Sequence, residues 1–416
     1  MNDEFDDYPF FSDEEHDLLE MAQVAFAQGN LAQALELGEA WLEDHPLDVE
    51  AMHLCALAAA SQRDENKAMA LYRKALRLEP AHGTLHHNVG ALLERRKEYA
   101  QALHHLQRAL ELQPDFPEIY INLGNVLDAL GRGEEALAMY QEALRRLPET
   151  DDVYFNQGCT LNRMGRYQEA LESFEAVLQG DPRSAAALNG KGLALTGLDR
   201  DEEAIAAFSK AIETGPDSTL YRYNRALALR GQQRPQDALR DLDKALEIDP
   251  GFLEAALQKA EVLHELGQWD ASWQTLAAVE KPDPARPEIA CCRGLLLEGQ
   301  GDLNGALDAL EQCLDSFPDD RRALGHKGLV LMELGRYDEA ILCFNAVLDQ
   351  GENPDIAYRR ACIYARQGLV RKAVQSLGQA AAHDPAKLLA AQTDAAFDAV
   401  RETPSFRRLF KKFHLV

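Results

Sequence analysis

Apolar residues recur along most of the chain at a spacing near 3.6 residues, in stretches of about a dozen residues. Short turns separate the stretches, as at Gly29 and Asn30. This spacing is typical of amphipathic helices, and the regular turns predict that the helices are joined in pairs. The pattern therefore predicts an all-α protein built from helix–turn–helix units.

A proline returns every 34 residues through most of the chain. Proline starts or stops a helix because it fixes φ and lacks the backbone N–H. A sustained period of this kind indicates a repeat architecture, in which one unit cannot bury its apolar face alone and stacks on the next. The tenth unit lacks the residue, and the phase resumes at Pro385. The regular positions are Pro46, Pro80, Pro114, Pro148, Pro182, Pro216, Pro250, Pro284 and Pro318.

Three other positions keep the same phase. Alanine or serine stands twelve residues before the proline position, as at Ala136, and alanine or glycine stands twenty-four before it, as at Gly124. A third position holds Tyr, Phe or Leu, as at Tyr140, with Gly38 as the exception. Small residues let two helices approach closely, and we expect the large residue to fill the gap between neighbouring units.

This pattern resembles the tetratricopeptide repeat, whose signature is a small residue in the first helix, alanine in the second and a closing proline. Two close matches are INLGNVLDALGRGEEALAMYQEALRRLP at 121–148 and YFNQGCTLNRMGRYQEALESFEAVLQGDP at 154–182. The resemblance implies a right-handed superhelical solenoid of about eleven repeats over residues 15–387. It implies a binding role without identifying the partner, since one fold hosts many functions.

The two ends and one internal segment depart from the repeat. Residues 1–14 are expected to be an acidic disordered tail, and residues 388–416 to form capping helices and a basic tail. In the latter segment Phe397, Phe406 and Leu409 are expected to cover the last apolar face. Three prolines, at 282, 284 and 287, predict a kink near 281–287.

The net charge is −26 at pH 7, and no Lys or Arg precedes Arg63. Such an acidic balance disfavours nucleic acid and anionic membranes as partners. The absence of a long apolar run predicts no membrane insertion, and the acidic start does not fit a secretory signal, so we expect a cytoplasmic protein. Seven cysteines without CxxC spacing are expected to act as small apolar residues in helices rather than as disulfides.

In tetratricopeptide repeat proteins the first helix of each unit lines a concave groove, so the resemblance places a ladder of asparagines there. An asparagine amide can bond a ligand backbone whatever its side chains, and aromatic residues can anchor it. The ladder resembles the asparagine-lined groove in the repeat domains of O-linked N-acetylglucosamine transferases. The alternative is that the asparagines satisfy neighbouring helix ends. The predicted peptide-binding residues are Asn88, Asn122, Asn125, Phe155, Asn156, Asn189, Tyr223 and Asn224.

Two other kinds of site are not expected. Some arrays of this family clamp a C-terminal carboxylate with Lys and Arg, but Ile121, Ala186 and Gly190 stand where those cations would be. A metal site would need imidazoles that converge. The clustered histidines fall on different helices of one unit, so we expect that they do not converge, and we predict no metal or cofactor. They are His82, His86, His87, His104 and His105.

No nucleophile motif, phosphate loop or dinucleotide fingerprint occurs, and few residues remain outside the repeats for a catalytic domain. The sequence therefore predicts a non-enzymatic scaffold or adaptor that binds an extended peptide or partner protein in the groove. Two alternatives stay open: a substrate-recruiting subunit of a separate enzyme such as a glycosyltransferase, and a self-assembling structural protein.

Self-association through the termini is a further expectation. Residues 1–15 combine seven acidic residues with Phe5, Tyr8, Phe10 and Phe11, whereas residues 401–416 are basic. Acidic residues interleaved with aromatics can form a docking motif that is disordered until it binds. A disordered solubilising tail is the alternative.

Overall fold

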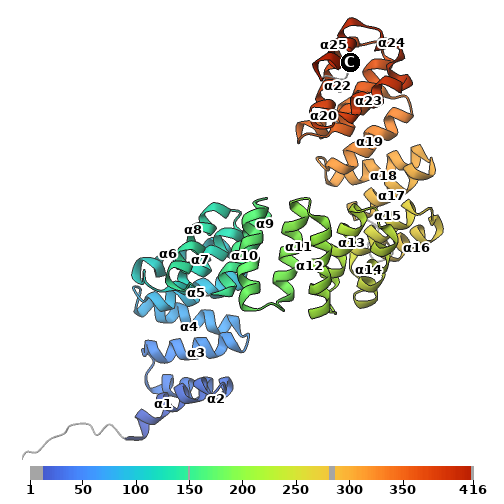
Figure 1. The fold of residues 1–416 in the computed structure, drawn as a ribbon. Coiled ribbons are helices and arrows are strands. Elements are labelled where there is room, and N and C mark those ends of the chain that lie inside the picture. The colour runs from blue at the N-terminus through green and yellow to red at the C-terminus, as the bar shows by residue number, and fades with distance from the viewer. Residues whose placement is uncertain (1–12, 149, 281–285, 414–416) are drawn as a thin grey trace, which may run out of the picture. The chain divides into compact units, whose positions relative to one another are not determined.

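Helices make up the regular secondary structure of the computed structural model, which describes residues 13–148, 150–280 and 286–413 (Figure 1). The prediction of an all-α fold is confirmed for these residues. Residues 1–12 of the predicted tail, and Pro282 and Pro284 of the predicted kink, lie outside them. The chain forms two compact units, residues 1–216 and residues 217–416, and each unit is described by itself.

The described residues of the first unit form six helix pairs. The first helices of the pairs are α1 (Asp13–Ala27), α3 (Val49–Ser61), α5 (Gly83–Arg95), α7 (Pro117–Ala129), α9 (Asp151–Arg163) and α11 (Ala185–Gly197). The second helices are α2 (Leu31–Asp44), α4 (Glu65–Leu78), α6 (Tyr99–Leu112), α8 (Gly133–Arg146), α10 (Tyr167–Gly180) and α12 (Asp201–Thr214). Each helix contacts the partner in its own pair, and the second helices α2, α4, α6, α8 and α10 contact the first helix of the next pair.

The described residues of the second unit form five further pairs and a cap segment, residues 386–412. The first helices are α13 (Thr219–Gly231), α15 (Leu253–Glu265), α17 (Pro287–Gln300), α19 (Arg321–Glu333) and α21 (Pro354–Arg366). The second helices are α14 (Pro235–Ile248), α16 (Trp269–Glu280), α18 (Leu303–Ser316), α20 (Tyr337–Asp349) and α22 (Val370–His383). The cap segment comprises α23 (Ala386–Thr393), η1 (Ala395–Phe397), α24 (Asp398–Arg401) and α25 (Pro404–Lys412).

The turn within each pair has one residue in the left-handed region. After α7 this residue is Gly131, with φ +75°. The N–H of Gly131 donates to the carbonyl of Asp128 and the N–H of Arg132 to that of Leu127, at 2.9 Å each, which is the Schellman arrangement. The corresponding positions are Gly29, Arg63, Lys97, Gly165, Asp199, Gln233, Gly267, Gly301, Gly335 and Gly368.

The small and large positions of the period meet between helices. An ideal Cβ on Gly124 of α7 would lie only 2.4 Å from Cε1 of Tyr140 on α8, so the glycine makes room for the ring. The expectation that the large residue fills the gap between units is therefore incomplete, because its nearest small partner lies in its own pair. The ring of Phe174 fills both kinds of gap, because it packs against Gly158 of its own pair and against Gly190 of the next pair.

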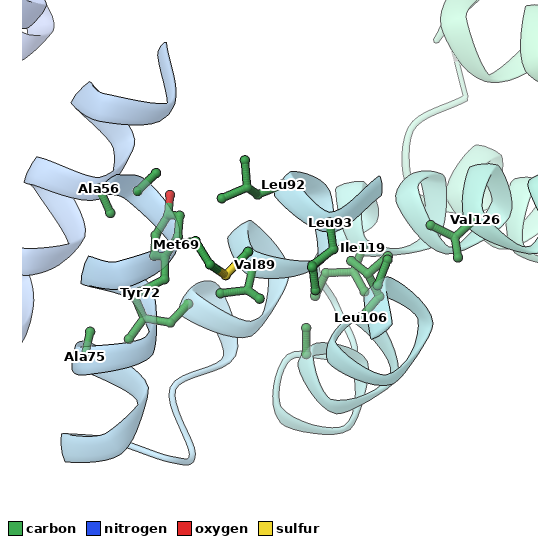
Figure 2. Close-up of a cluster of buried hydrophobic side chains, with 14 of the residues drawn as sticks. Ala56, Met69, Tyr72, Ala75, Val89, Leu92, Leu93, Leu106, Ile119 and Val126 are labelled. Atoms are coloured by element: carbon green, nitrogen blue, oxygen red, sulfur yellow. The ribbon is translucent and has the colours of Figure 1, made fainter. Parts of the chain in front are cut away.

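Figure 2 shows how this packing joins successive pairs in the first unit. Tyr72 of α4 lies among apolar side chains of α3 and α5, and Leu106 of α6 lies between α5 and α7. Both side chains are almost completely buried. One continuous apolar cluster thus runs across five helices, which is how short helices that are unstable alone stabilise each other.

The cap segment packs against the last helix pair. Phe397, Phe406 and Leu409 are buried in one cluster with Tyr358 of α21 and Leu377 of α22. The hydroxyl of Tyr358 also donates to Asp394 at 2.7 Å. The apolar faces of α21 and α22 are therefore covered on this side. Within the described part of the chain, none of the helices combines the length and the apolar character that crossing a membrane requires.

Candidate peptide-binding site

The asparagines predicted from the sequence link neighbouring first helices of the first unit. The Nδ2 atom of Asn88 on α5 lies 2.7 Å from Nε2 of His53 on α3, and Nδ2 of Asn122 on α7 lies 2.9 Å from Nε2 of His87 on α5. In both cases the two residues are 35 positions apart. The amides therefore bond to side chains of the preceding pair rather than to helix ends.

The next member of the ladder continues this arrangement with different partners. Asn156 on α9 donates from Nδ2 to Oδ1 of Asn125 at 3.0 Å, and the same oxygen accepts from the hydroxyl of Tyr140 at 3.0 Å. This carbonyl oxygen has used both of its lone pairs. The ring of Phe155 lies 5.9 Å from that of Phe174, edge to face. Asn125 and Asn156 thus fix α7, α8 and α9 to one another.

The remaining predicted residues differ in exposure. Asn189 of α11 and Asn224 of α13 are both buried. Tyr223 of α13 lies 5.3 Å from the ring of Phe252 and lines a cavity of the second unit. Its surroundings raise the pKa of Tyr223, chiefly through burial and then through the nearby carboxylates of Glu254 and Glu261. Ligand binding by the predicted set stays a prediction.

We expect the double substitution Asn122→Ala with Asn156→Ala to lower the melting temperature, because it removes two side-chain bonds between first helices. Each hydrogen bond contributes about 0.5–1.5 kcal/mol to stability. Thermal unfolding followed by circular dichroism measures the loss. Asn304→Ala at an exposed position of α18 is the control. An unchanged melting temperature would show that these amides do not hold the helices together.

The prediction that the histidine pairs do not converge is wrong for His86 and His105. Their Nδ1 atoms, on α5 and α6, lie 3.0 Å apart, and Nε2 of His86 lies 3.1 Å from the carbonyl oxygen of Pro80. Burial lowers the pKa of His105 to about 4, with His86, His104 and Arg73 adding to the effect. Within the described ranges, no group of three or more metal-binding side chains occurs.

The first helices of the second unit line three adjoining cavities that the sequence did not reveal. Their volumes are about 560, 210 and 450 Å³, and Arg322 of α19 lines all three. Glu261 of α15 lines the second and third. We call this surface the acidic groove. Its carboxylates outnumber its arginines, which are Arg230, Arg321 and Arg322. The carboxylates are those of Glu254, Glu261, Glu265, Glu288, Glu298, Asp320, Glu333 and Glu352.

A buried ion-pair network ties the acidic groove together. One oxygen of Glu261 lies 2.9 Å from Nη1 of Arg230 on α13 and 2.7 Å from Nη2 of Arg322 on α19. The carboxylate is 6% exposed, while the arginines are partly open to solvent. Arg230 also pairs with Glu265 and donates to Gln258 at 2.6 Å. Glu261 therefore connects helices that are three pairs apart in the chain.

Three thiols line the second cavity of the groove, those of Cys291, Cys292 and Cys313. Burial is the main cause that raises the pKa of each, and the pKa of Cys291 reaches about 12. The thiols are therefore protonated at neutral pH. Since the thiolate is the reactive form, these cysteines act here as small apolar groups, as the sequence suggested.

Comparisons with known proteins agree with the geometry. Family models described as tetratricopeptide repeat match residues 19–82, 155–219 and 293–355, residues 81–149 and 115–183, and residues 229–291. No curated protein matches the chain significantly.

Two solved structures illustrate the fold. Human IFIT1, in a dimer with m7Gppp-AAAA, has 15% sequence identity, a TM-score of 0.55, and coverage of 80% of this chain and 87% of that chain. Yeast Tom70 has 16% identity, a TM-score of 0.50, and coverage of 97% and 99%. At these identities the likeness concerns the fold alone.

Proposed function

The chain belongs to the tetratricopeptide repeat family, whose arrays serve as protein-interaction scaffolds, and from that premise we propose that its acidic groove holds an extended basic segment of a partner protein. The observation that carries the proposal is the row of three adjoining cavities joined by Arg322 and surrounded by carboxylates. The protein then acts as an adaptor without a catalytic role of its own.

The shape of the groove favours an extended ligand. The cavities of about 210 and 450 Å³ both lie beside α13, α15, α17 and α19, and the one of about 560 Å³ lies between α19 and α21. A ligand that fills the last and either of the others must therefore cross from one first helix to the next. An extended peptide does this with its backbone while its side chains enter separate cavities. Tyr223 and Phe317 line the second cavity and can pack against the stem of a lysine or arginine.

The charge of the groove favours a basic ligand. Part of its acidity is already balanced, because Glu261 and Glu265 pair with arginines. Glu298 lies 2.7 Å from Nδ1 of His326. Glu254 and Glu288 occupy equivalent positions on α15 and α17, and both are exposed. Complementary charge at such rim positions guides encounter and partner choice more than it adds contact energy.

The test is charge reversal at the groove rim. A partner is first captured with the full chain from the native host, and its affinity is measured by titration calorimetry. Glu254→Lys with Glu288→Lys should weaken binding at least about tenfold, because it places like charges against a basic segment. Both side chains are exposed, so the fold should tolerate the changes.

The matched control is Glu247→Lys with Asp308→Lys, which makes the same change in net charge on the exposed faces of the second helices α14 and α18. It should leave the affinity close to that of the native chain. Equal weakening by both variants would indicate a long-range charge effect, and no weakening by either would place the binding surface elsewhere.

A further inference from the structure

The last helix of the cap segment has two different faces. Phe406, Leu409 and Phe410 of α25 are buried against the rest of the cap, whereas Arg407 and Lys411 are exposed. The helix carries four cations, which also include Arg408 and Lys412, and no acidic residue. An exposed basic face thus lies directly over an aromatic layer.

A cavity of about 410 Å³ opens at this face, separate from the acidic groove. Phe406 and Phe410 form its apolar wall, with ring centroids 4.9 Å apart. Arg401, Arg407 and Lys411 also line it. We call it the cap pocket. Its combination of aromatic wall and basic rim suits a ligand that carries both aromatic and acidic side chains.

The carboxylates near the cap pocket do not remove its preference for an acidic ligand. Arg401 lies 2.9 Å from Oδ1 of Asp398, and Arg407 pairs with Glu402 on the surface. Lys411 is exposed. An exposed pair such as Arg407 with Glu402 adds little stability, so a more acidic ligand can displace Glu402. Glu402 is the only carboxylate among the pocket-lining residues, and a carboxylate of the ligand can therefore take its place beside Arg407.

We propose that the cap pocket binds the N-terminal segment, residues 1–12, of a second copy of this protein. That segment contains Asp3, Glu4, Asp6 and Asp7, and its four aromatic residues lie within seven positions. It has no Lys or Arg. The same short stretch thus supplies both features that the pocket selects, and this proposal does not depend on the acidic groove.

The cations of α25 could alternatively face an anionic lipid surface. A basic amphipathic helix binds lipid by burying its apolar face among the acyl chains. Here that face is already covered: Phe406 and Phe410 are each 3% exposed, and Leu409 is 9% exposed. The helix can therefore offer a lipid surface little beyond charge, whereas a peptide side chain can enter the cap pocket beside Arg401, Arg407 and Lys411.

The contact joins two unlike surfaces, so a bound pair still has a free pocket on the copy that gave its segment and a free segment on the other copy. Such a contact builds open chains that grow with concentration, or rings, rather than a two-fold dimer. It also weakens with added salt, because the charges involved are exposed and are screened within about 8 Å at physiological ionic strength.

The experiment measures the mass of the full-length protein by light scattering over a range of concentrations and at low and high salt. We expect the mass to rise with concentration at low salt. Reversing the pocket charges, with Arg407→Glu and Lys411→Glu, should weaken association at least about tenfold. Reversing the segment, with Asp3→Lys, Asp6→Lys and Asp7→Lys, should have the same effect, and combining both sets should restore association.

The control is Arg240→Glu with Lys244→Glu, an exposed pair on α14 with the same spacing and the same change of charge. It should associate like the native protein. The proposal is wrong if the native protein stays monomeric throughout, if the control loses association equally, or if the combined variant fails to recover it. Pocket-dependent binding to phosphatidylserine vesicles by a protein that remains monomeric would assign the cations to lipid instead.

Discussion

Replacing Gly124 with leucine is expected to lower the melting temperature of the protein markedly. The first added carbon would already lie 2.4 Å from Cε1 of Tyr140, and Tyr140 is 1% exposed. The ring cannot turn away without losing the bond from its hydroxyl to Asn125. Overpacking of this kind costs about 1–3 kcal/mol and sometimes more. Scanning calorimetry of the full chain measures the shift.

The matched comparison uses alanine at two glycines of first helices. Gly124→Ala should also destabilise the fold, because its Cβ meets the same ring. At Gly325 of α19 the nearest atom to a new Cβ is Cδ1 of Ile356, at 3.8 Å, which is ordinary contact. Gly325→Ala should therefore be neutral or stabilise by about 0.5–1 kcal/mol, since alanine favours a helix. Equal effects at both positions would contradict the proposed role of Gly124.

The second large effect is expected for Glu261→Gln in the acidic groove. The substitution keeps the shape of the side chain but removes the charge that faces Arg230 and Arg322. Breaking a fully buried ion pair costs about 3–5 kcal/mol, and we expect about 2–3 kcal/mol here because both arginines are partly exposed. Urea unfolding followed by circular dichroism measures the free energy.

Glu339→Gln on α20 provides the comparison for that prediction. Its partner Arg336 lies 2.6 Å away, but both side chains are about half exposed, so the loss of the pair should not change the unfolding curve detectably. Similar shifts for the two variants would show that the network around Glu261 has no special contribution. A larger loss at Glu261 would establish that the groove is held together by this carboxylate.

The fold could be predicted from the sequence because it is set by local and repeated causes. The prolines follow the ends of the second helices: Pro114, for example, comes after α6, which ends at Leu112. Gly124 and Tyr140 meet because they are neighbours across one short turn. Such contacts depend only on position within the period, so a single sequence shows them many times.

The side-chain contacts around the candidate site were not predicted, because they connect different pairs. Asn122 with His87, Arg163 with Asp128, and Arg230 with Glu265 are each 35 residues apart, one more than the period. A search for complementary residues at that separation would have found them. The contact between Glu261 and Arg322 could not be found in this way, since it reaches from α15 past α17 to α19.

The left-handed residue in each turn shows which part of a unit determines the geometry of the turn. At Lys97 the backbone makes the same two bonds as at Gly131, although a side chain is present, and Arg63, Asp199 and Gln233 also have positive φ. Each of these residues accepts a strain of about 1 kcal/mol that glycine would avoid. The helices on either side thus impose the conformation of the turn, and its central residue need not be glycine. A turn glycine replaced by another residue should therefore cost only about 1 kcal/mol as long as the packed positions of its unit are kept.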